Sequence, residues 1–341
     1  MLGYQKLNPK SLMPTITNYL DPQTLASVGS LQLRARLVVE GLMAGMHRSP
    51  YHGVSVEFAQ HRQYTPGDDI RRLDWKVFGR SDKLYLKQYQ KETNLDLVLL
   101  VDASGSMAYG SDEVAGNRWR KFDCASTLAS VLAYLAVNQQ DRAGLMLFDD
   151  ALRGTIRPTN ARRQCRAIVD ALAQHELALG DNELTEAQAR GSRAALFTGR
   201  GTDLGRLFDQ IGARLTHRSL IVLISDVFDA VESFERGLAR LSHRRHDVVV
   251  VQMMDHAEIM FPFRSSAEFV GMEGEGRLRL DPAALRAAYM RTMREHLGRV
   301  EDITTRFKYD YMLVDTSAPL GAPLSRLLLK RAAANEAATR R

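Results

Sequence analysis

The sequence predicts an α/β protein built on a doubly wound, mostly parallel sheet. From Leu95 onward, short apolar runs alternate with longer amphipathic stretches, and the apolar runs are nearly continuous. Strands that alternate with helices form parallel sheets through right-handed crossovers, and strands buried on both faces are rich in Val, Ile and Leu throughout. The 341 residues are 45% hydrophobic and 25% charged, which is an ordinary globular composition.

Each element follows from a local pattern. The apolar runs predict buried strands, and Leu152–Arg157 is predicted as a short edge strand; the buried runs are Leu95–Val101, Gly144–Phe148, Ser219–Ser225, Asp247–Met253 and Tyr311–Val314. Apolar residues at three- and four-residue spacing predict helices over Lys121–Asn138, Ala161–Ala173, Asp203–Leu215, Val231–Leu241 and Pro282–Leu297. Glu268–Leu280 is predicted as a hairpin and the polar stretch Leu177–Arg200 as a loop.

The N-terminal quarter of the chain has a different pattern and is predicted as an extended, partly β segment. It contains a candidate helix over Gln32–Met46, an alternating stretch Tyr51–Phe58 and a turn-rich polar stretch Tyr64–Asp74. The predicted boundaries are therefore 1–93 for this segment, 94–318 for the α/β domain, and 319–341 for a C-terminal helix that ends in a basic tail.

Composition argues against several classes of protein. The chain has a net charge of +6, of which residues 1–93 carry +5 without interleaved aromatic residues, so we expect no specific nucleic-acid binding. The longest uncharged stretch, Cys124–Gln140, has 17 residues and is partly polar, whereas a membrane span needs about 20 apolar residues. No signal peptide is apparent, and Cys124 and Cys165 fit free thiols, so we expect a soluble, cytoplasmic protein without a membrane span.

The most informative motif is Asp102-Ala103-Ser104-Gly105-Ser106, which directly follows the most apolar predicted strand. Ligands of doubly wound sheets bind beyond the carboxyl ends of the strands. A carboxylate and two hydroxyls at alternate positions can turn three oxygen atoms toward one point, and hard oxygen ligands suit Mg²⁺. The alternative is a capped loop whose hydroxyl groups bond to neighbouring amides.

Two further oxygen donors come at the ends of later elements. Thr202 lies in Gly199–Asp203 just before a predicted helix, and Asp226 ends the predicted strand Ser219–Ser225. We therefore expect three loops to converge at one edge of the sheet.

At this point the chain resembles a known family. Asp102, Ser104, Ser106, Thr202 and Asp226 together resemble the metal-ion-dependent adhesion site of von Willebrand factor type A domains. The upstream stretches Gly53–Phe58, Tyr64–Asp69, Arg71–Trp75 and Gly79-Arg80 resemble the signature of the domain of unknown function family number fifty-eight. Members of that family resemble a von Willebrand A domain, a Rossmann-type fold, with an added N-terminal segment, and are often encoded beside MoxR-type AAA+ ATPases.

The resemblance implies a function for these residues. The five named side chains would form a site for Mg²⁺, or for Mn²⁺ in its place. The serine and threonine hydroxyls would contact the ion, and Asp102 and Asp226 would act largely through water or from outside the ion's direct ligands. One coordination position would stay free for the carboxylate of another protein. The chain is then expected to be a Mg²⁺-dependent adaptor or co-chaperone partner of a MoxR-type AAA+ ATPase, or of another protein that offers a carboxylate.

Enzymatic functions find less support in the sequence. There is no Gly-x4-Gly-Lys-Ser/Thr loop, no Gly-x-Ser-x-Gly around Ser104 and no His-Glu-x-x-His, so we expect no catalytic residues and no enzyme. A Mg²⁺-dependent hydrolase or phosphoryl-transfer enzyme is the alternative, although the position of a second catalytic carboxylate is occupied by Ser104. The stretch Pro66–Trp75 is either a docking surface or, as we favour, an ion-paired turn.

Overall fold

A computed structural model describes residues 22–46, 61–63, 78–79, 85–87, 96–114, 117–161, 163–184, 204–228, 231–265, 267–270 and 277–328. Within these ranges six strands form one sheet in the order β12-β9-β8-β3-β6-β7. Their bounds are β3 (Asp96–Asp102), β6 (Arg142–Phe148), β7 (Leu152–Thr159), β8 (Ser219–Ser225), β9 (Asp247–Met254) and β12 (Asp310–Asp315). Only β7 is antiparallel to its neighbour in this sheet, so the predicted α/β class with a mostly parallel sheet is confirmed.

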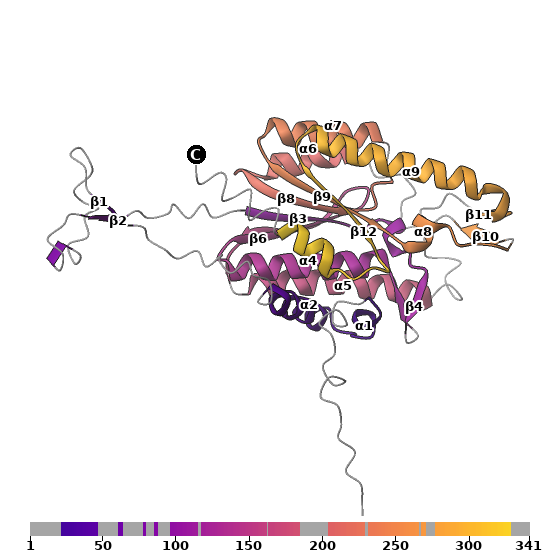
Figure 1. Cartoon of the computed structure of the whole chain (residues 1–341), viewed down its shortest axis with the longest axis horizontal. Coiled ribbons are helices and arrows are strands. Elements are labelled where there is room, and N and C mark those ends of the chain that lie inside the picture. Colours follow the sequence, from indigo (N-terminus) through magenta and orange to yellow (C-terminus); the bar gives the residue numbers. More distant parts are fainter. Residues whose placement is uncertain are drawn as a thin grey trace, which may run out of the picture. The chain divides into compact units, whose positions relative to one another are not determined.

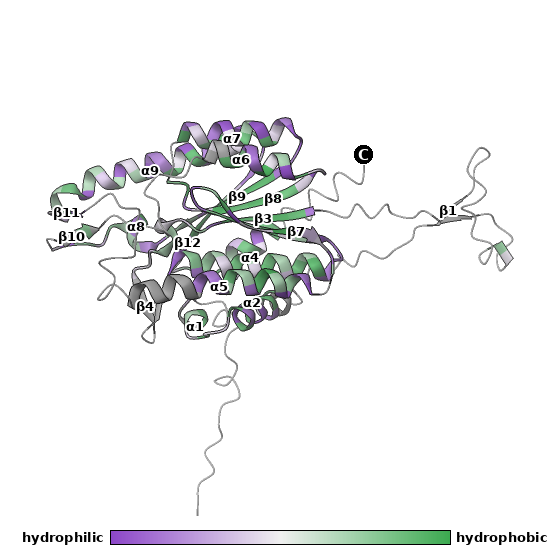
Figure 2. Cartoon of the chain, turned by 180° about the vertical axis from the view of Figure 1, so that it is seen from behind, coloured by the Kyte–Doolittle hydropathy of each residue, from purple (hydrophilic) through white to green (hydrophobic). Residues whose placement is uncertain are grey.

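Helices cover both faces of the sheet (Figure 1). One face carries α4 (Lys121–Asn138) and α5 (Gln164–Leu184), with α1 (Pro22–Ala26) and α2 (Leu31–Met46) packed outside them; the other carries α6 (Leu204–Arg214), α7 (Val231–His243) and α9 (Pro282–Arg306). Two apolar cores result, because successive side chains of a strand point to opposite faces: Leu99 belongs to the first core and Leu100 to the second. The central strands are accordingly apolar along their length (Figure 2).

The carboxyl edge of the sheet carries the shorter elements. The 3₁₀ helix η3 (Gly105–Ala108) and the hairpin of β4 (Asp112–Val114) and β5 (Asn117–Trp119) follow β3. The short helix α8 (His256–Met260) and the hairpin of β10 (Ala267–Val270) and β11 (Arg277–Leu280) follow β9, and a helix over 321–328 follows β12.

The structure corrects the predicted loop Leu177–Arg200 at its start, because α5 continues through Leu184. A buried ion pair helps to hold this longer helix in place. Glu176 near its centre accepts a hydrogen bond from Arg34 Nη2 of α2 at 2.5 Å and another from the Ser126 hydroxyl of α4. Residues 185–203 lie outside the described part of the chain.

The chain divides into two compact units, residues 1–45 with 95–341, and residues 46–94. The predicted helix Gln32–Met46 is confirmed as α2, and its Val38 and Leu42 belong to the same core as α4. In the second unit the described residues include an antiparallel pair of strands, β1 (His61–Gln63) and β2 (Tyr85–Lys87). The boundaries 1–93, 94–318 and 319–341 stay a prediction; the stretches Tyr51–Phe58 and Tyr64–Trp75 and the tail after residue 328 lie outside the described residues.

Substitutions at two glycines in helices allow the packing of the second core to be tested. A Cβ added to Gly237 of α7 would overlap the Phe208 ring of α6, whereas a Cβ added to Gly298 of α9 meets no atom within 4 Å. We expect Gly237→Ala to lower the free energy of unfolding by about 1–3 kcal/mol, because overpacking outweighs the gain in helix propensity. The matched control Gly298→Ala should raise it by roughly 0.5–1 kcal/mol. Urea unfolding measures both changes, and equal midpoints for the two variants would contradict this packing.

Candidate functional site

The candidate site lies where the strand order of the sheet reverses. The chain continues from β3 to β6 on one side, whereas β8 lies on the other side of β3 and continues to β9. Ligands of doubly wound sheets bind at such a reversal, outside the carboxyl ends of the strands. Asp102 is the last residue of β3, and Asp226 directly follows β8. Both carboxylates therefore come to the same point of the sheet edge.

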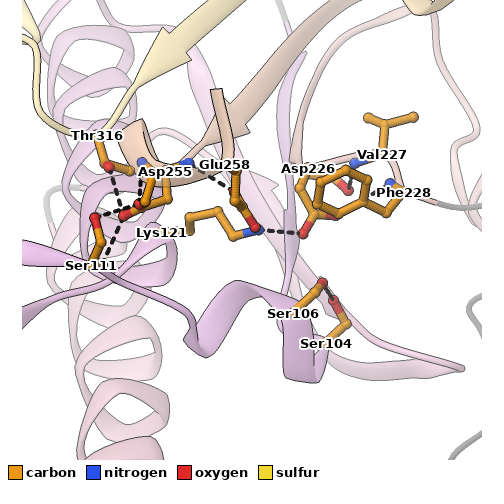
Figure 3. Close-up of polar contacts among 12 residues, drawn as sticks. Ser104, Ser106, Ser111, Lys121, Asp226, Val227, Phe228, Asp255, Glu258 and Thr316 are labelled. Carbon is orange, nitrogen blue, oxygen red and sulfur yellow. Dashed lines mark hydrogen bonds and ion pairs between the residues drawn. The ribbon is translucent and has the colours of Figure 1, made fainter. Parts of the chain in front are cut away.

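The residues after β3 turn tightly around the Asp102 carboxylate. The Ser104 N–H donates to Asp102 Oδ1 at 2.9 Å, and the Ala103 N–H donates to the Phe148 carbonyl of the neighbouring strand β6 at 2.7 Å. The Oγ atoms of Ser104 and Ser106 are 3.1 Å apart (Figure 3). Three of the predicted ligands thus present their oxygen atoms within one turn.

Ser225 joins this turn to the end of β8. Its hydroxyl donates to Asp102 Oδ2 at 2.5 Å and accepts a hydrogen bond from the Val227 N–H at 3.0 Å. Asp226 is buried as well, and its negative charge adds to the burial of Asp102 in raising the pKa of the Asp102 carboxyl. The structure therefore brings Asp226 together with the Asp102 turn. Thr202, the fifth predicted ligand, lies outside the described residues.

A buried lysine lies at the same place. Lys121, the first residue of α4, is 0% exposed, and its Nζ is 2.9 Å from Asp226 Oδ2 and 2.8 Å from Glu258 Oε1 (Figure 3). The Phe228 ring centroid lies 5.0 Å from Nζ. Burial on its own lowers the pKa of a lysine, but the Asp226 and Glu258 carboxylates outweigh it and hold the pKa of Lys121 above its ordinary value. Lys121 is therefore a charged group inside the protein.

The turn after β8 has an unfavourable backbone conformation that its neighbours stabilise. Val227 has a φ of 54°, in the left-handed region that β-branched residues rarely adopt. Gln252 Nε2 of β9 donates to the Asp226 carbonyl at 2.8 Å, and His296 of α9 hydrogen-bonds to the Val227 backbone. The Phe228 ring stacks on His296 with centroids 5.6 Å apart and is 44% exposed. Strain of this kind persists only where surrounding contacts fix it, and it is typical of functional sites.

Glu258 is held by the start of α8. The Asp255 carboxylate caps this helix by accepting from the Ala257 N–H at 2.8 Å, and it also accepts from the Ser111 hydroxyl at 2.5 Å (Figure 3). In return, Glu258 Oε2 accepts from the Asp255 N–H at 2.9 Å. Burial raises the pKa of Glu258, and Lys121 opposes this rise. The Lys121 ion pairs thus connect α8 to the end of β8.

The sequence patterns did not indicate that Lys121, Ser225 and Glu258 belong to the site. One signal for the lysine is available in retrospect: α4 has no charged residue between Cys124 and its end, which favours extensive burial of this helix. A lysine in the first turn of a largely buried helix then needs a carboxylate partner. Nothing in the spacing of residues points to Glu258, which lies 137 positions later.

The donor set fits a hard divalent cation such as Mg²⁺. Burial, and then the charge of Asp226, raise the pKa of Asp102 from 3.8 to about 7. The two carboxylates and the hydroxyls of Ser104 and Ser106 are oxygen ligands of the kind that Mg²⁺ prefers. Across the described ranges, no group of three or more His, Cys, Asp and Glu side chains is arranged to hold a metal ion.

The raised pKa of Asp102 predicts a pH dependence of stability. The folded protein binds a proton at this carboxyl more tightly than the unfolded chain does, since the pKa is about 7 in the folded protein and 3.8 for an aspartate fully exposed to water. The stabilising contribution is therefore complete below about pH 4 and is lost as the pH rises to about 7. In the presence of a chelator, the free energy of unfolding of the unmodified protein should fall across this range relative to Asp102→Asn. Parallel curves for the two proteins, measured by urea unfolding, would contradict the assignment.

Comparison with solved structures gives matches of low sequence identity. The conserved hypothetical protein BatB from Bacteroides thetaiotaomicron is 16% identical with a TM-score of 0.42, and the match covers 70% of this chain and 98% of that one. An aerotolerance-related membrane protein from Bacteroides fragilis is 16% identical with a TM-score of 0.41, over 69% of this chain and 99% of that one. An uncharacterized membrane spanning protein from Vibrio fischeri is 17% identical with a TM-score of 0.20, over 70% and 97% of the two chains.

These matches correct the expectation of a cytoplasmic protein. Two of the three matched structures are described as a membrane protein and a membrane spanning protein. Among the helices that the structure describes, none combines the length and the apolar character that crossing a bilayer requires. The cytoplasmic assignment made from the sequence is therefore withdrawn.

Relatives in sequence are uncharacterized. Mb1516 from Mycobacterium bovis and Rv1480 from Mycobacterium tuberculosis are each 24% identical over 242 residues, which cover 71% of this chain and 68% of the relative. Residues 60–299 match the family described as Protein of unknown function DUF58, which confirms the family that the upstream stretches resemble. This match extends over more than half of the sequence, and the chain therefore belongs to the DUF58 family.

Proposed function

We propose that the chain is a Mg²⁺-dependent protein-interaction module of the von Willebrand factor type A kind. The observation that carries the proposal is the turn in which Asp102, Ser104 and Ser106 gather their oxygen atoms beside Asp226, which follows the neighbouring strand β8. These are four of the five residue types and positions of a metal-ion-dependent adhesion site. The fifth, Thr202, is included from the sequence alone.

Each residue has a defined part in the proposed site. The Ser104 and Ser106 hydroxyls would hold the ion directly, and Asp102 and Asp226 would hold it largely through water. The bound ion supplies a coordination position that a carboxylate oxygen of another protein can fill. The Ser104 N–H and the Ser225 hydroxyl fix the Asp102 carboxylate with one hydrogen bond to each oxygen, which leaves further lone pairs on both oxygens.

An exposed aromatic ring beside the site supports a protein partner. Phe228 is 44% exposed although it follows a buried strand, and it is held by its contact with His296. Aromatic residues are enriched in the centres of protein interfaces, where they are buried on binding. A partner that brings a carboxylate to the site would come close to this ring.

We propose a MoxR-type AAA+ ATPase as the partner. This choice depends on the family resemblance, since members of the family are often encoded beside such ATPases. The chemistry required of the partner is a carboxylate on an accessible loop or at a chain end.

The proposal predicts that partner binding depends on the metal ion. Affinity for a MoxR-type ATPase, measured by calorimetry with Mg²⁺ and again with a chelator, should fall at least tenfold without the ion, since one coordination bond to a carboxylate is lost. Ser104→Ala should cause a similar loss in Mg²⁺. Ser130→Ala is the matched control, because Ser130 is a buried serine of α4 whose hydroxyl has no hydrogen-bond partner among the described residues.

Two results would contradict the proposal. Equal affinity with Mg²⁺, with chelator and in Ser104→Ala would show that the contact does not involve the ion. Turnover of a generic phosphoester that requires Mg²⁺ and is lost in Asp102→Asn would establish the alternative, a metal-dependent hydrolase.

A further inference from the structure

Lys121 is a cation supplied by the chain itself at the edge of the proposed metal site. Its Nζ donates to Asp226 Oδ2 at 2.9 Å, and Asp226 is one of the proposed metal-site carboxylates. We propose that the Lys121 ammonium competes with the divalent cation for Asp226 and thereby weakens metal binding. The inference rests on the proposed function, because it concerns the same site.

The ammonium group is held firmly in place. Lys121 is completely buried, it is paired with Glu258 at 2.8 Å as well as with Asp226, and the Phe228 ring lies 5.0 Å from its charge. Its position at the start of α4 fixes the direction from which the side chain approaches. A buried carboxylate without a partner is strongly destabilising, and the lysine is a partner for Asp226 when no metal ion is bound.

Competition follows from the shared carboxylate. A divalent ion held by Asp226, directly or through one water, lies within a few ångströms of the ammonium and is repelled by it. Even at the dielectric constant of water, the repulsion between a doubly and a singly charged cation about 5 Å apart weakens metal binding by roughly tenfold. A buried site increases this effect.

Glu258 provides a second partner for the lysine. Because Nζ already contacts Glu258 Oε1, the ammonium stays paired when the metal ion takes over the Asp226 carboxylate. Glu258 is itself fixed, since its Oε2 accepts from the Asp255 N–H and its carbonyl accepts from the Tyr289 hydroxyl at 2.9 Å. The charge of Lys121 is therefore compensated both with and without the metal ion. The repulsion between the ammonium and the ion then lowers the affinity of the site for the metal.

Mn²⁺ alone serves as the probe, because it accepts the same oxygen ligands as Mg²⁺ and its binding is measured directly by electron paramagnetic resonance. The comparison is between Glu258→Gln and the double variant Lys121→Met/Glu258→Gln, which differ only at the lysine. Methionine retains a flexible, unbranched apolar side chain, and glutamine removes the second negative charge that would otherwise lose its partner. We expect the double variant to bind Mn²⁺ at least tenfold more tightly than Glu258→Gln.

Lys121→Gln in the otherwise unmodified chain is a second test that retains a hydrogen-bond donor, and it should also bind Mn²⁺ more tightly than the unmodified protein. Thermal unfolding confirms which variants are folded. Equal or weaker Mn²⁺ binding without the lysine charge overturns the inference, and the proposed function still stands if the unmodified protein binds Mn²⁺ and Ser104→Ala does not. Absence of Mn²⁺ binding in every folded protein overturns both. Binding that appears only without the lysine, and is lost on adding Ser104→Ala, supports the inference.

Discussion

Buried negative charge at the carboxyl edge of the sheet is the constraint on which the site depends. Asp102 and Asp226 are nearly inaccessible to solvent, and the largely buried Glu258 lies close to Asp226, so the protein gives up much of the hydration of three carboxyl groups. Charged groups are removed from water at a large cost in free energy unless they are paired. The protein meets this cost with one lysine placed between two of the carboxylates, and with hydrogen bonds from Ser104 and Ser225 to the third.

The sheet itself produces this concentration of charge. β3 and β8 are parallel neighbours in register from Asp96 opposite Ser219 to Val101 opposite Ile224, so residues that follow the two strands emerge side by side. All seven residues of β3 are buried, which leaves no place for the Asp102 carboxylate except the edge where the strand ends. The burial of the strands that stabilises the fold therefore also brings the polar residues at the ends of β3 and β8 together at the edge of the sheet.

The parts of the fold that sequence patterns predicted are those fixed by local periodicity. The bounds of α4 and β8 were predicted without error, because α4 shows a long apolar stripe and β8 a continuous apolar run between polar residues. The end of α5 was predicted wrongly, because the polar stretch from Leu177 continues the helix. This helix is supported by a contact of Glu176 with Arg34, which lies 142 positions away. Local patterns do not contain such a contact. The site also contains residues that local patterns indicate and residues that they do not. Asp102 and Asp226 could be predicted because each lies at the end of an apolar strand, and adjacent parallel strands end at the same edge of the sheet.

The ion pairs of Lys121 could not be predicted, because they join positions that are 105 and 137 apart and local patterns do not identify such partners. A side chain that neutralises a buried charge must lie close to it in the fold, but it can come from any position in the sequence. The exposed position of Phe228 follows from the same charge, since its ring lies over Lys121, where the π-face interacts favourably with the ammonium. The left-handed backbone at Val227 and the exposed ring each carry a cost in stability when considered alone. The exposed ring is therefore a consequence of enclosing a charged group at the edge of a sheet, whereas the turn at Val227 is held by Gln252 and His296.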